Sequence, residues 1–375
     1  MQEPAGRATE PRFERIAYHV VSTGSETWQS FNFTTLTGVV QFGGWDPALQ
    51  QRARAHGVRT FSEFGWACLP SQPCTWIANR TEAALRAQAA VDLANQRGAD
   101  GINIDIEGAG APSCTAPDLE YFVREVSRRF AGGTTGTIGT NDANDTNNTV
   151  VRVILNVNAF PDAVSPRAGQ AYNFTALSAI ATGAGVHLAI MLYDMAWWNA
   201  GVPHVATANS PIESATSTLQ RLVTPGSPQH VPAERLLAVW PWYGYSYACN
   251  ESTPLLSPCK NALPYCCGPA TAAKQVSFAD ALRAQHSPGA TAVQRSGTST
   301  NVTGSPWFDM VDANGTRHQV HFDDEQSLRA KYAVASSLGL RGVAVWTANA
   351  DYLQPLLPDH TADQRVLFAT LQEDS

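Results

Sequence analysis

Apolar runs of strand length recur along the chain, and most of them are separated by stretches with a helical pattern. Helix-like stretches include 80–98, where apolar positions recur at helical spacing, and 118–130. Eight runs have the length and composition of strands: 16–21, 38–44, 59–64, 101–107, 152–158, 186–194, 236–245 and 342–349. Strands that alternate with helices predict a parallel sheet, and eight such units predict a closed (β/α)8 TIM barrel. An open, doubly wound parallel sheet would give the same pattern and remains the alternative.

The spacing of the runs predicts one large domain with an insertion. Residues 1–14 have no apolar core and are expected to be a loose lead-in, while 15–375 form a single domain. Between the seventh and eighth strands, about 246–325 are rich in Pro, Ser and Cys and are expected on the barrel rim. This insertion contains the segment PWFDMVDANGTRHQVHF, whose Asn-Gly pair predicts a β-hairpin. A helix over 324–339 should follow as the last of the fold.

Charge and hydropathy exclude two classes of partner. The 375-residue chain has a formal net charge of −7, and no basic run of the kind that phosphate binding requires is present. We therefore expect neither nucleic acid nor an anionic membrane as a partner. No apolar stretch reaches the roughly 18 residues that span a bilayer, so we expect no membrane span.

Glycosylation sequons are dense, which favours the secretory pathway. Eight asparagines lie in N-x-[ST] sequences and are candidate glycosylation sites: Asn32, Asn79, Asn144, Asn147, Asn173, Asn250, Asn301 and Asn314. We expect a lysosomal or secreted monomer whose signal peptide is absent from this numbering. A cytosolic protein remains the alternative.

The cysteines are clustered in a way that suits disulfides. Cys68 and Cys74 bracket a short loop that a disulfide could close, and a second group occupies the insertion: Cys249, Cys259, Cys266 and Cys267. The count of seven leaves at least one thiol unpaired within a monomer. Because paired CxxC motifs are absent, we expect no metal, and nothing in the chemistry predicted below needs a cofactor.

The run GINIDIE (101–107) places polar side chains inside a strand that is otherwise apolar. Alternation along a strand sends Asn103, Asp105 and Glu107 to one face, which in a barrel is the interior. The other face, expected to pack on the helices, carries Ile102, Ile104 and Ile106. Glu107 would then lie nearest the C-terminal mouth, where barrel enzymes have their active sites.

Two carboxylates on the inner face indicate acid–base chemistry. Asp105 and Glu107 would be about 7 Å apart along the strand. Burial of two such groups should raise the pKa of at least one of them, which is what a general acid requires. An edge strand with a solvated polar face is the alternative. The motif alone predicts an acid-catalysed hydrolase.

The segment DGINIDIE resembles the DxxDxDxE signature of the family-18 glycoside hydrolases, the chitinase family, and is closest to its chitobiase branch. Three more segments resemble that family in the same order: MLYD (191–194), VWPWYGYSYAC (239–249) and RGVAVWTANADY (341–352). The insertion hairpin also resembles that branch. The likeness covers the fourth to eighth strands well and the first hundred residues more weakly. Asn103 stands where the general signature has Asp, which leaves the tuning of Asp105 open.

The resemblance implies a catalytic group. Glu107 would protonate the glycosidic oxygen and later deprotonate water, while the N-acetyl carbonyl of the sugar attacks C1 to give an oxazolinium ion. Asp105 would orient the acetamide N–H and stabilise the developing positive charge. Tyr193 would donate its hydroxyl to the acetamide oxygen. The family needs no metal and no cofactor for this reaction.

The resemblance also implies residues that hold the sugar. Asp194 would bond the sugar and Trp346 would form the apolar floor beneath it. The remaining expected substrate contacts are Met191, Trp242, Tyr243 and Asn103. Each has a structural alternative: Trp346 and Tyr193 could be core residues, Asp194 could cap a helix, and Trp242 and Tyr243 could pack without touching substrate.

Three functions follow, in order of preference. The first is a retaining hydrolase that cleaves β-1,4-linked N-acetylglucosamine, in chitobiose cores of N-glycans or in short chitooligosaccharides. The second is a secreted endo-chitinase or an endo-β-N-acetylglucosaminidase. The third is a lectin that binds N-acetylglucosamine oligosaccharides without cleaving them, which the presence of Asp105, Glu107 and Tyr193 disfavours.

Overall fold

The computed structural model describes residues 13–21, 27–67, 74–107, 115–130, 151–159, 172–180, 185–195, 205–249, 254–259, 273–296, 304–349 and 360–372. Within these residues, eight parallel strands close into a barrel in the order β1-β13-β7-β6-β5-β4-β3-β2. Their bounds are β1 (Glu14–Val20), β2 (Gly38–Phe42), β3 (Arg59–Ala67), β4 (Gly101–Glu107), β5 (Val153–Asn158), β6 (Val186–Met191), β7 (Leu236–Pro241) and β13 (Gly342–Trp346). The predicted TIM barrel is confirmed, and the open sheet is excluded.

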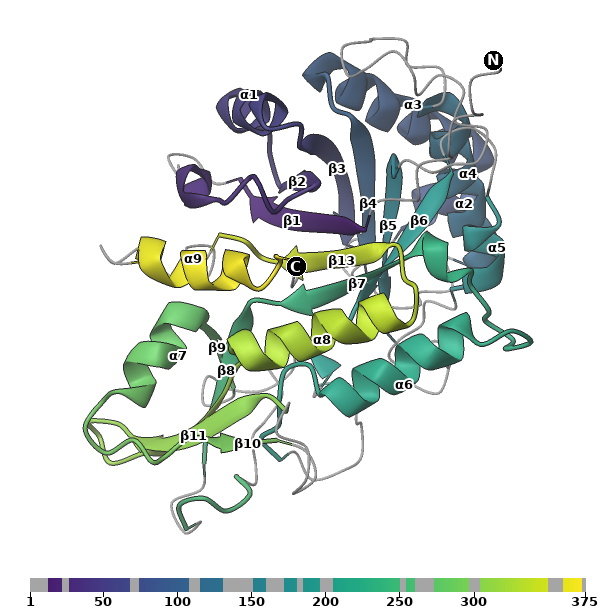
Figure 1. The fold of residues 1–375 in the computed structure, drawn as a ribbon. Helices are drawn as coiled ribbons and strands as arrows, with labels where there is room; N and C mark the ends of the chain where they lie inside the picture. Colours follow the sequence, from purple (N-terminus) through teal and green to yellow (C-terminus); the bar gives the residue numbers. More distant parts are fainter. Residues whose placement is uncertain are drawn as a thin grey trace, which may run out of the picture.

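Helices follow most of the barrel strands and cover the outside of the barrel (Figure 1). They are α1 (Pro47–Ala55), α2 (Thr75–Ala78), α3 (Arg80–Arg97), α4 (Ala116–Phe130), α5 (Phe174–Ser178), α6 (Ile212–Val223), α8 (Glu325–Ser337) and α9 (His360–Ala369), with short 3-10 turns η1 (Thr27–Ser30) and η4 (Ala233–Arg235). The helices predicted at 80–98, 118–130 and 324–339 are confirmed. The helix at 324–339 was also predicted to be the last of the fold. This part was wrong, because α9 follows β13 and ends the described fold. None of the described helices is long and apolar enough to cross a membrane.

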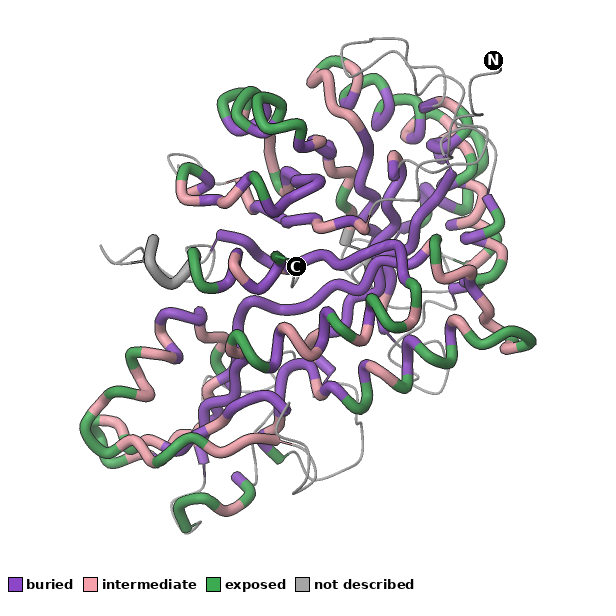
Figure 2. The backbone as a smooth tube through the Cα atoms, viewed as in Figure 1, coloured by how far each residue is buried: buried purple, intermediate pink, exposed green. Residues whose placement is uncertain are grey.

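Most residues of the barrel strands are buried, and the tube is purple along these strands in Figure 2. Outward-facing residues join a large core with the helices, whereas a separate apolar cluster that includes Ile16, Tyr18, Phe61 and Ile154 fills the interior. This two-sided burial explains why the strands are continuous apolar runs in the sequence.

Strand β4 has the predicted alternation. Its three isoleucines are buried in the outer core together with apolar residues of α3 and α4. Asn103 is completely buried and Asp105 is 7 % exposed. Glu107 is the last residue of the strand, and its side chain lies outside the described part of the structure.

A second sheet lies beside the barrel, with strand order β10-β11-β12-β8-β9. It consists of β8 (Tyr243–Ala248), β9 (Lys274–Ser277), β10 (Gln294–Arg295), β11 (Pro306–Val311) and β12 (Arg317–His321), and α7 (Phe278–Gln285) follows β9. The predicted hairpin is confirmed as β11 and β12, with Gly315 at φ +81° in its turn. The single strand predicted over 236–245 is wrong: β7 ends at Pro241, and the chain enters the second sheet at Tyr243.

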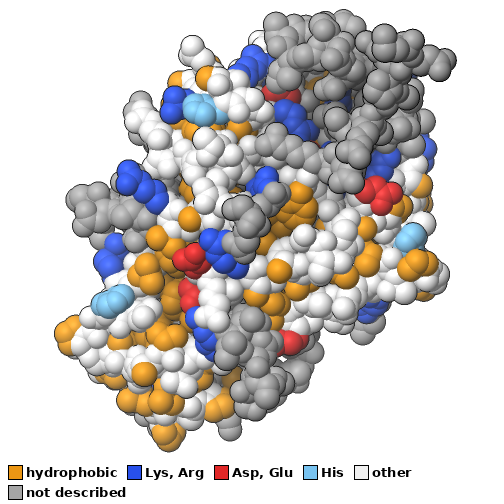
Figure 3. Space-filling model, in the orientation of Figure 1, with side chains coloured by type: hydrophobic (Ala, Val, Ile, Leu, Met, Phe, Trp, Pro, Cys, Tyr) orange, Lys and Arg blue, Asp and Glu red, His pale blue; other side chains and the backbone are white. Residues whose placement is uncertain are grey.

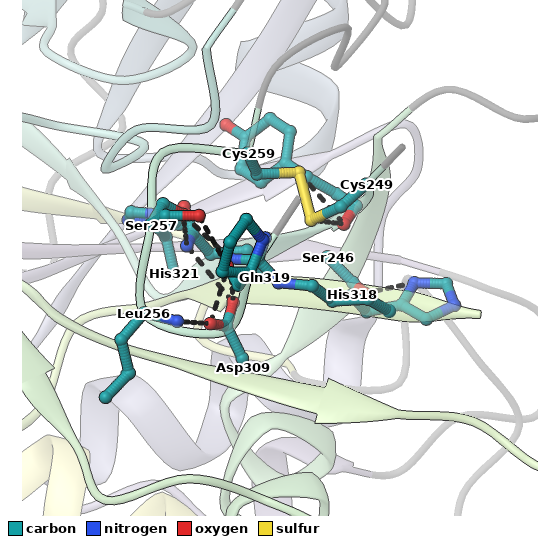
Figure 4. The surroundings of a disulfide bond; sticks show 12 residues. Ser246, Cys249, Leu256, Ser257, Cys259, Asp309, His318, Gln319 and His321 are labelled. Carbon is teal, nitrogen blue, oxygen red and sulfur yellow. Dashed lines mark hydrogen bonds and ion pairs between the residues drawn. A yellow bond between two sulfur atoms is a disulfide. The ribbon is translucent and has the colours of Figure 1, made fainter. Parts of the chain in front are cut away.

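A disulfide and a buried ion pair anchor the loop that follows β8. Cys249 is bonded to Cys259, as Figure 4 shows. The Asp309 carboxylate accepts the N–H of Leu256 and lies 2.9 Å from the Arg317 guanidinium, which is nearly as buried as Asp309 itself. Arg317 also donates to the carbonyl oxygen of Ser257 in the same loop. This end of the second sheet is therefore held by covalent and charged contacts.

Of the other cysteines expected to form disulfides, only some lie within the described residues. Cys74 is disulfide-bonded, and the cysteine predicted to pair with it, Cys68, lies outside the described residues, as do Cys266 and Cys267.

On the face shown in Figure 3, basic side chains are dispersed among neutral and apolar ones. Exposed apolar side chains around the second sheet include Leu255, Leu256, Val293 and Val311.

Candidate active site

A buried hydrogen-bond network connects three barrel strands beneath Asp105. The Tyr18 hydroxyl on β1 donates to Oδ1 of Asn156 on β5 at 2.5 Å. Nδ2 of Asn103 donates to the same oxygen at 2.9 Å and to the Tyr18 hydroxyl at 3.1 Å. Nδ2 of Asn156 lies 3.2 Å from Oδ1 of Asp105. The inner face of β4 is therefore bonded across the barrel, which requires it to face inward as predicted.

Strand β3 lies next to β4 on the side opposite β5. Gly65 is in register with Asp105, and Glu63 is in register with Asn103. A Cβ atom at Gly65 would collide with the Glu63 carboxylate, so that carboxylate extends along the strand toward the barrel mouth. Burial raises the pKa of Glu63, while the N–H of Gly43, 2.8 Å away, and Arg97 lower it.

An aromatic group lies at the mouth around Trp346, the last residue of β13. Its ring centroid is 5.7 Å from that of Tyr18 and 4.8 Å from that of Phe42, with interplanar angles of 62° and 81°. Both neighbours therefore meet Trp346 at a steep angle instead of stacking on it. Trp346 is half-buried and packs against the interior cluster, as does Tyr193. The two predicted residues are thus brought to the same apolar group as Tyr18.

Asp194 follows β6 and is fixed by two tyrosines of the second sheet. The hydroxyls of Tyr243 and Tyr245 donate to its Oδ1 at 2.5 and 2.6 Å. Its backbone has φ 54°, in the left-handed region that non-glycine residues seldom adopt. The Asp194 N–H donates to Oδ1 of Asn209 at 2.6 Å, and Asn209 in turn donates to the Tyr243 carbonyl oxygen. The helix-cap alternative for Asp194 does not account for these contacts.

The tyrosines at Asp194 are held as hydrogen-bond donors. Burial raises the pKa of Tyr243, and the Asp194 charge raises it further. Because a protonated hydroxyl can donate to a carboxylate, this arrangement stabilises the charged form of Asp194. The Tyr193 ring lies 6.2 Å from that of Tyr243, so the second sheet contributes directly to the surroundings of the residues that follow β6.

Met191 and Trp242 were both predicted to contact the substrate, and the structure places them in different surroundings. Met191 is buried at the end of β6, two residues beyond Ala189, a member of the interior cluster, so the two side chains share the inner face of the strand. Trp242 is a correction: its indole N–H donates to the Tyr332 hydroxyl at 2.9 Å, and its ring contacts Phe368 edge-on. Trp242 therefore packs between the barrel and the outer helices and does not join the residues at the mouth.

The structure also adds residues that sequence reasoning missed. Tyr18 and Asn156 complete the network under Asp105, Phe42 contacts Trp346, and Tyr245 shares Asp194 with Tyr243. The signal for Asn156 was a polar residue in the apolar strand RVILNVN, the same signal that identified GINIDIE. No group of three or more His, Cys, Asp or Glu in the described ranges is arranged to hold a metal ion.

The fold and this polar, aromatic centre at the carboxyl ends of the strands define a (β/α)8-barrel protein with its candidate site at the usual mouth. The sequence model of glycosyl hydrolases family 18 matches residues 51–351. The chain therefore belongs to glycosyl hydrolase family 18 and is a glycoside hydrolase.

Two di-N-acetylchitobiases are among the relatives that this chain resembles in sequence. Di-N-acetylchitobiase of Mus musculus is 27 % identical over 356 residues, which cover 91 % of this chain and 84 % of the relative. Di-N-acetylchitobiase of Homo sapiens is 25 % identical over 373 residues, covering 91 % and 80 %.

Solved structures share the fold at lower identity. A chitinase from Rhizomucor miehei has a TM-score of 0.64 at 16 % identity, covering 96 % of this chain and all of that one. The Group IV chitinase of Ostrinia furnacalis has a TM-score of 0.63 at 17 % identity, covering 91 % and 94 %.

Proposed function

We propose that this protein is a retaining glycoside hydrolase that cleaves β-1,4-linked N-acetylglucosamine in chitobiose cores of N-glycans or in short chitooligosaccharides. The observation that carries the proposal is the inward placement of Asp105, one alternation below Glu107, at the barrel mouth of a family-18 chain. The names of the relatives support the substrate class.

The proposed reaction uses the substrate's own acetamide as nucleophile, as in other family-18 enzymes. Glu107 gives its proton to the glycosidic oxygen as the C1–O bond breaks, and the acetamide carbonyl oxygen bonds to C1. Glu107 then takes a proton from water, which attacks C1 and opens the oxazolinium ring. Two inversions at C1 give net retention.

Asp105 and Tyr193 act on the acetamide in this proposal. The oxazolinium ion is positively charged, so an anion beside it stabilises the transition state more than the ground state. Asp105 accepts the acetamide N–H and provides that anion, and Tyr193 donates to the acetamide oxygen. The network through Asn156 supports this role because it fixes one oxygen of Asp105.

Trp346 and Asp194 hold the sugar. An apolar sugar face packs on an aromatic ring, while its rim needs hydrogen-bond partners. Trp346 is half-buried among aromatic neighbours at the mouth, and Oδ1 of Asp194 accepts hydrogen bonds from the hydroxyls of Tyr243 and Tyr245. Both features suit a site that binds one sugar ring tightly.

Products from a labelled tetramer of N-acetylglucosamine test the substrate assignment. We expect single-sugar release from one end, because the preferred substrates are short. Internal cuts would instead favour the endo-chitinase or endo-β-N-acetylglucosaminidase alternative. Tight binding without hydrolysis between about pH 4 and 7, where a Glu of raised pKa can act as an acid, would favour the lectin.

A lysosomal or secreted location is proposed from the sequons. Asn79, Asn173 and Asn314 are exposed and Asn32 is half-buried, so these four are sterically open to modification in differing degree. The remaining candidates lie outside the described residues: Asn144, Asn147, Asn250 and Asn301. Enzymatic removal of N-glycans from the natively expressed protein should increase its mobility on a denaturing gel, and unchanged mobility would contradict this location.

A further inference from the structure

Asn156 occupies the centre of the network under Asp105. Its side chain is buried on the inner face of β5, with only 4 % of the residue exposed. Its carbonyl oxygen accepts two hydrogen bonds, from Tyr18 and Asn103. Its amide nitrogen faces two acceptors, Oδ1 of Asp105 at 3.2 Å and Oδ1 of Asn103 at 3.4 Å. All the hydrogen-bonding groups of this carboxamide are therefore used.

The direction of these bonds matches a charged Asp105. If the Asn156 amide alone were reversed, its NH2 group would face the NH2 group of Asn103, and its carbonyl oxygen would face the Asp105 carboxylate. Both contacts would be repulsive. In the observed orientation the amide donates to Asp105, and a donor favours the charged form of a carboxyl group.

Tyr18 reinforces this orientation. Burial raises the pKa of Tyr18, and the Asp105 charge raises it further. The hydroxyl therefore keeps its proton and donates it to the Asn156 oxygen, which leaves the Asn156 nitrogen to point at Asp105. Asn103 and Asn156 are both amides, and neither can take up the proton of Asp105.

We propose that Asn156 is a positioning residue that holds Asp105 as an oriented carboxylate by donating to its Oδ1. The proposal rests on the function proposed above, in which Asp105 acts as an anion. Titratable groups on the elements around Asp105 are Tyr18 on β1, Glu63 on β3, Glu107 on β4 and Tyr193 after β6. The donation to Oδ1 of Asp105 from β5 comes from the Asn156 amide.

The first test compares pH profiles of activity. Asn156→Leu removes the donor, so the pKa of Asp105 should rise and activity should be lost at a higher pH on the acid side. Loss of a hydrogen bond to a charged group corresponds to a shift of about 1 to 2 pH units in that limb. Gln50→Leu is the matched control, because it removes a buried amide that donates to the Arg97 and Gly98 carbonyl oxygens outside the barrel.

The second test uses stability and does not depend on catalysis. Asn156→Asp places a carboxyl group against Asp105, and two adjacent carboxyl groups cannot both ionise readily. One pKa in the folded protein is then raised above its unfolded value. Stability from such a group is present at low pH and is lost as pH rises, so the melting temperature should fall relative to wild type between about pH 4 and pH 7. Introducing Asp105→Asn as well should abolish this pH-dependent fall.

The outcomes separate the two proposals. A wild-type protein that hydrolyses no N-acetylglucosamine oligosaccharide contradicts the proposed function, and the stability comparison then decides the role of Asn156 alone. A wild-type profile shared by Asn156→Leu and Gln50→Leu, together with a fall in Asn156→Asp that survives Asp105→Asn, overturns the positioning role only. If Asn156→Leu does not fold, Asn156→Asp carries the test.

Discussion

Replacing Glu107 by glutamine is expected to lower turnover on short N-acetylglucosamine oligosaccharides by about 100- to 10,000-fold, the range that general acid–base catalysis contributes. The amide keeps the shape of the side chain but cannot donate a proton to the glycosidic oxygen or take one from water. Initial rates at saturating substrate measure the effect, and calorimetric titration with the same oligosaccharide should show binding within a few-fold of wild type.

The control for this variant is Glu234→Gln. Glu234 is exposed in the 3-10 turn before β7, so its replacement should leave turnover unchanged. Equal rates in Glu107→Gln and wild type would remove Glu107 from the chemistry. Loss of binding along with turnover would show that the substitution disturbs the cleft and not only the proton transfer.

The largest expected loss of stability comes from Lys331→Met. Lys331 on α8 is completely buried, and its Nζ lies 2.6 Å from the carboxylate of Asp323, which is 3 % exposed at its side chain. Ser305 and Ser327 donate to the other carboxylate oxygen. Burial lowers the pKa of Lys331 and the Asp323 charge raises it. The pair joins the end of the second sheet to a barrel helix.

Removing the lysine leaves the Asp323 charge buried without its partner, which costs about 3 to 5 kcal/mol of unfolding free energy. Urea unfolding measures this loss. Lys274→Met is the control because Lys274 is exposed on β9, and it should change stability by less than about 0.5 kcal/mol. Adding Asp323→Leu to Lys331→Met should restore part of the loss. Similar losses in the two lysine variants would contradict the importance of the pair.

The face of β4 could be predicted from the sequence because strand alternation is a local property. Polar side chains at every second position, with isoleucines between them, fit only one orientation when the isoleucines pack on helices. The closed barrel of eight strands was predicted from the alternation of strand-like and helix-like runs along the chain. The placement of Asn103 and Asp105 in the interior is the clearest result of that reasoning.

Local alternation could not predict that the barrel strand β7 ends at Pro241 and that the second sheet begins at Tyr243. The run LLAVWPWYGY is apolar throughout, and no polar break marks the point where the chain leaves the barrel. Trp242 lies between the two strands, and its ring turns outward to Tyr332 and Phe368. Its partners are about 90 residues or more away in sequence, so local pattern gives no information about them.

The network under Asp105 was missed for a similar reason. Tyr18 and Asn156 are 138 residues apart in sequence and meet only because β1 and β5 face one another across the closed barrel. A tyrosine in an apolar strand is ordinary, and a single asparagine within another apolar strand indicates a polar contact but does not identify its partner. Their roles depend on the third residue, Asn103, which bonds to both.

The crystal structure of Glu107→Gln with uncleaved chitobiose would test most directly whether the inner face of β4 performs the chemistry. We expect the glycosidic oxygen within hydrogen-bond distance of residue 107, the acetamide N–H on Asp105, the acetamide oxygen on the Tyr193 hydroxyl, and the sugar ring over Trp346. A disaccharide bound elsewhere, or one whose acetamide points away from Asp105, would contradict it.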